Sequence, residues 1–311
     1  MAKCLVLGAD GFIGSHLVDS LAEKSHKIRA FDRFARKAHS FKDNDNVEVV
    51  SGDFLNRHDL SQALRGIDYV FHFISTTTPA SAEDDPLIDI STNIQMSVEL
   101  FQECVEAGVK KVIFASTGGA VYGENSTEHV NEDTLPSPVS PYAIGKLTIE
   151  QYLRYFDKKF GLKALVFRIS NPYGERQSLA SRQGVIPIFL QHIAKNEPIT
   201  ILGDGSMVRD YIYVKDVADM IAGSFETAKE DLYNVGSGHG LSVNDLVDTM
   251  RQITDLDIRT EHAEKPPTYV DRVVLDVHRF ENEFPGMPKT DLAEGVKATW
   301  QYVRQQIGDE G

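Results

Sequence analysis

The chain has 311 residues, 41% of them hydrophobic and 25% charged, a composition typical of a soluble globular protein. This length allows one large α/β domain plus a smaller lobe, or two fused domains. Asp and Glu number 46 against 32 Lys and Arg, and the resulting net charge of −14 repels phosphodiester backbones. Nucleic acid is therefore excluded as an expected partner, whereas a small phosphorylated ligand in a local basic pocket stays compatible with the charge.

The apolar segments are too short for a membrane protein. The first one, CLVLGADGFIG, is interrupted by Gly8 and Asp10, and no later stretch approaches the length of a membrane span. The two cysteines, Cys4 and Cys104, are too few for a disulfide framework and are typical of core residues in a reducing compartment. We therefore expect a cytoplasmic protein with no membrane partner, and no motif suggests a metal site.

Strand and helix patterns alternate through the first half of the chain. The strand-like runs are KCLVL, KIRAF, VEVVSG, YVFHFI, KVIFAS and LKALVFRIS, separated by helix-like stretches such as SHLVDSLAEK and SVELFQECVEAG. This alternation predicts a parallel sheet covered by helices on both faces, and right-handed crossovers make it a doubly wound, Rossmann-type α/β fold. We expect residues 1–170 to form a dinucleotide-binding domain.

The pattern of strand-like and helix-like segments changes after residue 170. The segments NPYGERQ, ILGDGSMVRDYIYV, NVGSGHG and EKPPTY are shorter and richer in turn residues. We expect residues 171–311 to form mainly a smaller, mixed α/β substrate lobe, with some strands returning to the sheet. Helices are expected near Ile186–Lys195, Val214–Glu226, Val243–Thr254 and Leu292–Gln305.

Three glycines follow the first strand-like run, where LVLGADGFIGSHL carries Gly8, Gly11 and Gly14. A glycine pattern alone is a weak signal, but in a first βα turn it has a mechanism. The glycines allow a tight turn, a close approach of backbone to pyrophosphate, and close helix–strand packing, and the helix N-terminus binds the anion. We expect a dinucleotide site that includes Phe12 and Ile13; a glycine turn without a ligand is the alternative.

Further cofactor residues are expected where the next strands end. Asp32 comes eighteen residues after Gly14, where a carboxylate accepts from a ribose 2′-hydroxyl and repels a 2′-phosphate, favouring NAD over NADP. A merely solvated strand end is the alternative. Arg33 could pair with a phosphate but is better suited to stacking over adenine. The candidates at the ends of the third and fourth strands are Asp53, Phe54, Phe73, Ile74 and Ser75.

The segment SPYAIGK places Tyr142 and Lys146 four residues apart, which puts both side chains on one face of a helix. A lysine ammonium beside a phenol favours the phenolate, so the tyrosine could exchange a proton near neutral pH. The pair alone is a common chance pattern on solvated helices. Its significance comes from the glycine turn, Asp32 and the hydroxyls of VIFASTGGAVYG in the same chain.

These motifs resemble the extended short-chain dehydrogenases/reductases, specifically their NAD-dependent nucleotide-sugar epimerase/dehydratase group. The resemblance covers nearly the whole chain and is carried by GADGFIGS, SGDF, STGGAVYG, YAIGK, RISNPYGER and GDGSMVRDYIYVKDVA. The motifs are specific for the group and less so for any one member. They imply NAD as cofactor, a nucleotide sugar as substrate, and a homodimer joined by helices near 94–107 and 142–160.

The resemblance also implies a 4-epimerase mechanism on hexoses of the UDP-glucose and UDP-galactose type. Tyr142 would take the proton of the sugar's 4-hydroxyl while hydride moves from carbon 4 to NAD, and hydride would return to the other face of the rotated 4-keto sugar. Lys146 would hold the nicotinamide ribose. The family's catalytic hydroxyl usually lies four residues before the tyrosine of the Tyr-Gly pair, which here is Gly118, so Thr117 and Ser116 both stay candidates.

The second half contains residues that the resemblance assigns to the diphosphate of the substrate. Asn171 in RISNPYG matches an asparagine that donates to the diphosphate, and Arg209 in MVRDY matches an arginine that pairs with it. A salt bridge from Arg209 to Asp210 or Asp216 is the alternative.

An element of Arg-Pro-x-Asp type in related epimerases is replaced here by EKPPTYVDRVVLD, so Lys265 or Arg272 must supply the second phosphate contact. Val273 stands where glucose-type epimerases have a bulky tyrosine, which would leave room for an N-acetyl group on carbon 2. Ile186 is a further substrate candidate, and Asn93 matches a family asparagine near the cofactor, although an asparagine on a helix is usually just solvated.

The competing functions are a dehydratase or net reductase of the same group and a catalytically idle, NAD-sensing regulatory protein. Sugar-nucleotide 4,6-dehydratases of this family place an Asp-Glu pair just after the strand-end hydroxyl, where this chain has Gly118 and Gly119. Asp32 argues mildly against a reductase, and the intact Tyr142–Lys146 pair argues against an idle protein. The identity of the sugar, and the choice between UDP and dTDP, stay open.

Overall fold

The computed structural model describes residues 1–35, 38–124, 127–179, 184–265, 270–287 and 289–309. Two compact units emerge from the contacts within the chain. The first contains residues 1–117, 138–168 and 218–233, and the second contains residues 118–137, 169–217 and 234–311. The chain therefore passes between the units several times, and one passage lies between Arg168 and Ile169, next to the expected boundary at 170.

Among the described residues, seven strands form one sheet with the order β10-β6-β5-β4-β1-β2-β3. The pairs β1–β2, β2–β3, β1–β4 and β4–β5 are parallel. The chain order reverses between β1 and β4, the switch point at which doubly wound sheets bind ligands. The strands are β1 (Lys3–Leu7), β2 (Lys27–Asp32), β3 (Val47–Ser51), β4 (Tyr69–His72), β5 (Lys111–Thr117), β6 (Lys163–Ile169) and β10 (Leu232–Val235).

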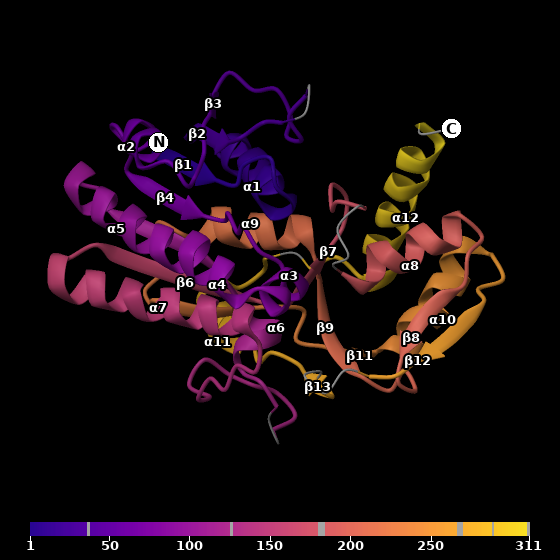
Figure 1. Ribbon diagram of the computed structural model, residues 1–311. Helices are drawn as coiled ribbons and strands as arrows, with labels where there is room; N and C mark the ends of the chain where they lie inside the picture. Colours follow the sequence, from indigo (N-terminus) through magenta and orange to yellow (C-terminus); the bar gives the residue numbers. More distant parts are fainter. Residues whose placement is uncertain (36–37, 125–126, 180–183, 266–269, 288, 310–311) are drawn as a thin grey trace. The chain divides into compact units, whose positions relative to one another are not determined.

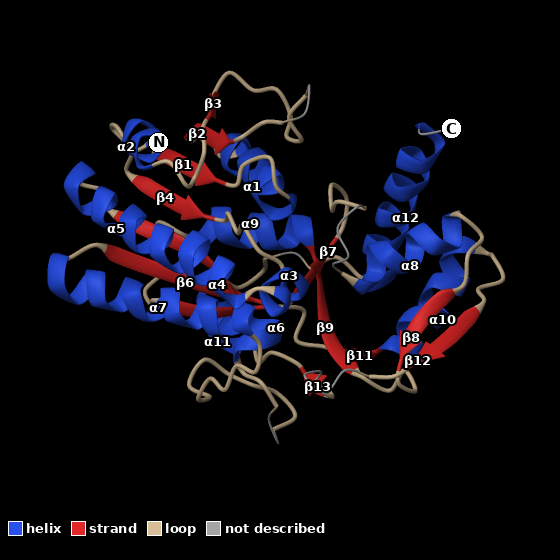
Figure 2. Ribbon diagram, in the orientation of Figure 1, coloured by secondary structure: helices blue, strands red, loops and turns tan. Residues whose placement is uncertain are grey.

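Helices cover both faces of this sheet, as the alternating pattern predicts (Figures 1 and 2). Buried side chains of α2, α5 and α7 pack with the strands in one hydrophobic cluster. On the other face, Ser20 of α1 donates to Asp219 of α9 at 2.7 Å. The helices are α1 (Phe12–Glu23), α2 (Arg57–Ala63), α3 (Pro79–Asp84), α4 (Pro86–Asp89), α5 (Gln95–Ala107), α7 (Pro141–Phe160) and α9 (Val214–Ser224), with α9 beginning in the second unit.

Helix α7 has strong local start and stop signals. The Ser140 side chain accepts from the Ala143 N–H, Pro141 occupies the first turn, and Gly161 ends the helix in the left-handed region with φ of 74°. Its apolar face joins the core through Ile149 and neighbouring buried residues. These signals fix the rotation and start of the helix, and therefore the direction in which Tyr142 and Lys146 point.

A π-helical turn, η1 (Ile90–Ile94), joins α4 to α5. Such turns widen the helix locally and occur frequently at functional sites. Here the turn leaves Asp89 and Asn93 both buried, at 3% and 7% exposure. The hydrophobic periodicity of the sequence gives no signal of this turn.

The second unit has its own hydrophobic core, built from α8, α10, α12 and the strands beside them. Strand β9 is central, since β7 and β13 pair with it in parallel and β11 pairs antiparallel. Strands β8 and β12 form a separate parallel pair. The elements are α6 (Gly118–Val121), β7 (Asn171–Tyr173), α8 (Val185–Ala194), β8 (Ile199–Leu202), β9 (Val208–Tyr213), β11 (Gly240–Ser242), α10 (Val243–Thr254), β12 (Thr260–Ala263), β13 (Arg272–Val273), α11 (His278–Glu283) and α12 (Leu292–Asp309).

Candidate active site

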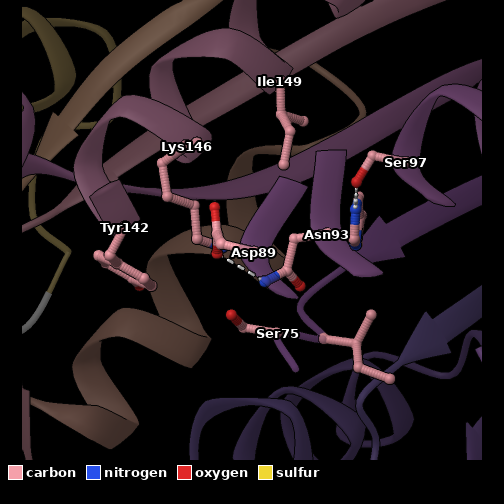
Figure 3. Close-up of a pocket in the computed structure, with 10 residues that line it drawn as sticks. Ser75, Asp89, Asn93, Ser97, Tyr142, Lys146 and Ile149 are labelled. Carbon is pink, nitrogen blue, oxygen red and sulfur yellow. Dashed lines mark hydrogen bonds between the residues drawn. The ribbon is translucent and has the colours of Figure 1, made fainter. Parts of the chain in front are cut away.

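The first unit contains a small cavity of about 10 Å³ at the switch-point edge of the sheet. Its walls come from strand β4, the segment after it, the turn around η1, and helix α7 (Figure 3). Seven of the ten lining residues are polar or ionisable, and the lining comes from separate parts of the chain. The lining residues are His72, Ile74, Ser75, Asp89, Asn93, Ser97, Tyr142, Gly145, Lys146 and Ile149.

Helix α7 contributes one complete face to this cavity. Tyr142, Gly145, Lys146 and Ile149 are spaced by three and four residues and therefore lie on one side of the helix. The Nζ atom of Lys146 lies 5.8 Å from the centroid of the Tyr142 ring and donates to the Ala115 carbonyl at 3.0 Å. The structure thus brings the predicted tyrosine and lysine together next to the end of β5.

Burial controls the ionisation of this pair. Removal from water raises the pKa of Tyr142 to about 12, and the negative charge of Asp89 acts in the same direction. Burial also lowers the pKa of Lys146 to about 8, against the opposing charges of Asp89 and Glu150. The phenolate that Lys146 is expected to favour is opposed in this structure by desolvation of the Tyr142 phenol and by the charge of Asp89.

The two candidate hydroxyls at the end of β5 have different surroundings. Ser116 is 5% exposed, and its hydroxyl donates to Glu150, which also forms a buried salt bridge with Arg168 at 2.7 Å. Thr117, the last residue of β5, is only half-buried. The buried network thus already uses the hydroxyl of Ser116.

Asn93 is held by four hydrogen bonds instead of being solvated. Its side-chain oxygen accepts from the backbone and the hydroxyl of Thr76 at 2.9 and 3.0 Å. Its nitrogen donates to Thr77 Oγ1 and to Asp89 Oδ1, both at 2.8 Å. The asparagine therefore has a fixed orientation at the cavity wall (Figure 3).

The glycine turn has the backbone that a dinucleotide site requires. Gly8 adopts a φ of 83°, and a Cβ at Gly14 would collide with the Gly8 carbonyl oxygen. Gly11 is the N-cap of α1, and no side chain caps the amides of that first turn. These amides are consequently oriented for an anion such as a pyrophosphate, with Phe12 and Ile13 half-buried beside them. The residues present fit a dinucleotide.

Asp32 ends β2 next to this turn. Its carboxylate oxygens accept from the backbone amides of Asp10 at 3.1 Å and Arg33 at 2.7 Å, which fixes the carboxylate at the strand end. Arg33 itself is exposed and free to lie over a flat ligand.

Other cofactor candidates divide between the surface and the core. Asp53 is half-buried and accepts from the Leu55 amide, whereas the Phe54 side chain is 1% exposed and packs in the hydrophobic core. Only the backbone of Phe54 is therefore left for a cofactor. Phe73 and Ile74 are half-buried, and Ser75 is exposed with its hydroxyl donating to the Thr77 carbonyl.

In the second unit, Asn171 and Arg209 are tied to backbone carbonyls. Asn171 donates to the carbonyl of Asp210 at 2.8 Å. The guanidinium of Arg209 donates to the carbonyls of Val208 at 2.8 Å and Val270 at 2.6 Å. Both side chains are half-buried, and their hydrogen bonds orient them before any ligand arrives.

The pairing of β9 with β13 places Val273 opposite Arg209 and Arg272 opposite Val208. Arg272 forms a salt bridge of 3.7 Å with Glu128, and Lys265 forms one with Asp271. Val273 is 4% exposed and Ile186 is 1% exposed in the core of this unit, so only the backbone of Ile186 is left for a substrate. Part of EKPPTY, residues 266–269, lies outside the described residues.

Sequence reasoning missed Asp89, His72 and Glu150. His72 accepts from or donates to Ser97 at 2.7 Å, and burial lowers its pKa to about 3, so it stays neutral. The only signal for Asp89 was a carboxylate four residues before Asn93. Over the described ranges, no cluster of His, Cys, Asp or Glu side chains is arranged to hold a metal ion, and no helix is long and apolar enough to cross a membrane.

Residues 4–236 match the model of the NAD dependent epimerase/dehydratase family. The match covers the glycine turn, β5, the Tyr142–Lys146 face of α7, and Arg209. The chain belongs to this family. It is therefore an enzyme of the epimerase/dehydratase type, and the expected family, Rossmann-type α/β fold and NAD cofactor are confirmed.

The chain is similar along its whole length to sugar-nucleotide epimerases. It is 32% identical to the UDP-glucose 4-epimerase of Mycolicibacterium smegmatis, across 98% of this chain and 99% of that protein. The UDP-glucose 4-epimerase of Thermotoga maritima, solved with UDP-glucose, has 35% identity and a TM-score of 0.89 over 98% of this chain and 99% of that one. The UDP-N-acetylglucosamine 4-epimerase of Methanobrevibacter ruminantium has 30% identity and a TM-score of 0.91 over 98% and 99%.

Relatives with other reactions are also similar. They include a dTDP-4-dehydro-6-deoxyglucose reductase of Escherichia coli, a UDP-N-acetyl-alpha-D-glucosaminuronate decarboxylase of Bacillus cytotoxicus and a dTDP-glucose 4,6-dehydratase of Streptomyces venezuelae. Family membership therefore fixes the cofactor and the type of enzyme, and the particular reaction has to be argued from the residues of the site.

Proposed function

We propose that this chain is an NAD-dependent sugar-nucleotide 4-epimerase that interconverts UDP-glucose and UDP-galactose through a transient 4-keto sugar. The observation that carries the proposal is the combination of a half-buried Tyr142 and a buried Lys146 on one helix face with a strand-end hydroxyl that is followed by glycines in place of carboxylates. This combination supports oxidation and reduction at one carbon and lacks the groups for loss of water.

Tyr142 acts in this proposal as the base that takes the proton of the sugar's 4-hydroxyl and later returns it. NAD, when bound, would supply the hydride acceptor and donor for carbon 4, and a positive nicotinamide ring would favour the Tyr142 phenolate against the effect of burial. Lys146, held at the Ala115 carbonyl, orients the nicotinamide ribose. Asn93, with its four hydrogen bonds, keeps the wall of the site in place.

We assign the second hydroxyl to Thr117. Ser116 is buried and donates to Glu150, so it stabilises the buried salt bridge of Glu150 with Arg168 instead of contacting a substrate. Thr117 is the half-buried last residue of β5 and can hydrogen-bond the oxygen from which Tyr142 takes its proton.

Gly118 and Gly119 argue against a 4,6-dehydratase. Loss of water needs an acid for the leaving 6-hydroxyl and a base for the proton on carbon 5, and glycine has no side chain for either role. Within the second unit, a Cβ on Gly119 would lie 3.3 Å from the Asn171 side chain, so the space beside this residue is already limited.

We assign binding of the substrate's diphosphate to Asn171 and Arg209. Arg272 would supply the second positive charge that contacts the diphosphate. A guanidinium presents its N–H groups in a planar fork that suits phosphate oxygens, so we expect a bound diphosphate to take over N–H groups of Arg209 that now donate within the second unit. We expect N-acetyl sugars such as UDP-GlcNAc and UDP-GalNAc to be tolerated, because Val273 is smaller than tyrosine. Activity on UDP-galactose with none on UDP-GalNAc would contradict this assignment.

A 4-keto reductase is the second candidate, supported by the similarity to a dTDP-4-dehydro-6-deoxyglucose reductase. The carboxylate of Asp32, held by two backbone amides, favours NAD over NADP. This argues against a reductase, because net reductases more often use NADP. A catalytically idle, NAD-sensing protein would have no need for Tyr142 and Lys146 together on the cavity face of α7.

We further infer a cytoplasmic homodimer. The outer face of α7 exposes Ile144, Tyr152 and Tyr155 to 49%, 39% and 46%, an apolar stripe suited to packing against a second copy. The two cysteines are free and buried, which suits a reducing compartment.

The proposal is tested by incubating the protein with UDP-galactose and following the nucleotide sugar by mass spectrometry and proton NMR. A 4-epimerase gives UDP-glucose of the same mass without net formation of NADH. A product lighter by one water, or one NADH for each sugar converted, would overturn the assignment.

A further inference from the structure

Asp89 is a buried carboxylate in the cavity, and the family's tyrosine, lysine, hydroxyl and asparagine leave it without a role. It is 3% exposed and ends α4, immediately before the π-helical turn. Its Oδ1 atom accepts from Thr77 Oγ1 at 2.5 Å and from Asn93 Nδ2 at 2.8 Å. Thr77 follows the cofactor candidates Phe73–Ser75 in the chain, and Asn93 is itself a cofactor candidate.

The second carboxylate oxygen, Oδ2, faces helix α7. A Cβ on Gly145 would collide with it, and Gly145 lies between Tyr142 and Lys146 on the cavity face of the helix. Among the described residues, none donates a hydrogen bond to Oδ2, and no cation lies within salt-bridge distance of it. Figure 3 shows Asp89 joined to Asn93, with Tyr142 and Lys146 of α7 around the same cavity.

Burying a carboxylate without an ion-pair partner is costly, and in the low dielectric of the interior its charge acts strongly on neighbouring ionisable groups. Glu150, the other carboxylate near Lys146, is already neutralised by its salt bridge with Arg168. Asp89 is therefore the carboxylate that favours the buried ammonium of Lys146 most, ahead of Glu150. The same charge disfavours a phenolate at Tyr142.

We propose that Asp89 is a positioning residue of the Tyr142–Lys146 site. Its Oδ1 fixes Asn93 and Thr77, and its Oδ2 places a negative charge against α7 that sets the pH range in which the pair works. The proposal rests on the proposed function, because it assigns Tyr142 and Lys146 the proton and ribose roles. Asp89 itself contacts neither substrate nor cofactor in this assignment.

The sign of the effect follows from the charge. Removing a negative charge makes an anion easier to form and a cation harder to keep, so the pKa values of Tyr142 and Lys146 both fall. The other ionisable groups around the pair do not oppose this. His72 of β4 stays neutral because burial lowers its pKa to about 3, and Glu150 of α7 stays paired with Arg168 of β6.

The test is the Asp89→Asn variant of the NAD-loaded protein. Asparagine has the same size, and its side-chain oxygen can still accept from Thr77 and Asn93, so the fold is retained. We expect the whole pH profile of kcat/KM for UDP-galactose to move to lower pH by about one unit, because a neighbouring charge shifts a pKa by this order.

The matched control is Thr77→Val, which removes the hydrogen bonds of Thr77 Oγ1 with Asp89 Oδ1 and Asn93 Nδ2 and keeps the carboxylate. Its pH profile is expected to coincide with that of the unchanged protein. An Asp89→Asn profile that coincides with the unchanged protein would overturn the proposal. A Thr77→Val shift as large as that of Asp89→Asn would show a purely structural role and overturn it as well.

A second readout does not depend on catalysis. The chain has 11 tyrosines, and the tyrosinate absorbance that disappears on Tyr142→Phe isolates the titration of Tyr142. In the NAD-loaded protein, Asp89→Asn is expected to lower this midpoint by about one unit as well. If the unchanged protein epimerises no UDP-hexose, the proposed function fails while this titration still tests Asp89. An unmoved midpoint would refute the role of Asp89 alone.

Discussion

Lys146 of the first unit and Arg209 of the second are both cations assigned to the site, but their surroundings differ. Lys146 is 8% exposed, donates to one backbone carbonyl, and has its pKa lowered to about 8 by burial. Arg209 is half-buried, and backbone carbonyls of Val208 and Val270 orient it. The surroundings of Lys146 therefore set how easily it loses its proton. The surroundings of Arg209 set the orientation of a guanidinium that stays charged.

This difference matches two proposed tasks, proton transfer in the first unit and diphosphate binding in the second. In the first unit Lys146 is buried and Tyr142 is half-buried, and the charge of Asp89 acts to raise the pKa values of both. The diphosphate candidates of the second unit keep their charge, since a guanidinium does not lose its proton in proteins. Changes in the first unit should therefore affect turnover, and changes in the second should affect the affinity for the nucleotide sugar.

The largest effect is expected for Tyr142→Phe, which removes the proton-transfer group and little else. Turnover should fall by about 10³-fold while the affinity for the nucleotide sugar stays nearly unchanged. Steady-state kinetics and calorimetric titration with UDP measure the two quantities. Retention of more than about a tenth of the rate would contradict the role of Tyr142.

Thr117→Val should lower turnover by about 10²-fold, because a hydrogen bond to the reacting oxygen is lost. The matched change Ser116→Ala removes a hydrogen bond to Glu150 and should instead cost about 1 kcal/mol in the free energy of unfolding, with turnover nearly retained. Rates and thermal unfolding of the two variants decide between the hydroxyls. The reverse ranking of the two rates would assign catalysis to Ser116.

Arg209→Ala tests whether changes in the second unit affect the affinity for the nucleotide sugar. Loss of a charged hydrogen-bond donor to the diphosphate should weaken nucleotide-sugar binding by about 10- to 100-fold, with a smaller change in kcat. Binding of UDP by calorimetry reads this directly. A fall in kcat with unchanged affinity would place Arg209 among the residues that act on turnover and would remove the distinction between the units.

The smallest effect concerns the choice of cofactor. Asp32→Ala removes the carboxylate held by the amides of Asp10 and Arg33, and the preference for NAD over NADP should fall by about tenfold. Fluorescence titration of the cofactor-free protein with both dinucleotides measures the ratio. Equal affinities of the unchanged protein for the two would already contradict the assignment of Asp32.

The parts of the fold that depend on local pattern could be predicted from the sequence. The run KCLVL coincides with β1, and the helix expected at Val243–Thr254 coincides with α10, where Ser242 and Asp245 form a capping box. The pairing of Tyr142 with Lys146 likewise follows from helical spacing and from the cap at Ser140.

Properties that depend on tertiary burial could not be predicted. Whether Ser116 or Thr117 is free depends on Glu150, which lies far along the chain, and Phe54 and Ile186 turn into the two cores. The direction of the Tyr142 pKa depends on desolvation and on Asp89, whose position requires the π-helical turn. None of these leaves a local sequence signal.

In the proposed reaction, oxidation and reduction occur at carbon 4, and no C–H or C–O bond is broken at any other carbon of the sugar. Conversion of UDP-galactose in heavy water, followed by proton NMR and mass spectrometry, tests it most directly. A 4-epimerase gives UDP-glucose that carries no solvent deuterium on carbon, because the hydrogen of carbon 4 leaves and returns within the site. Deuterium at carbon 5, or a product lighter by one water, would contradict it.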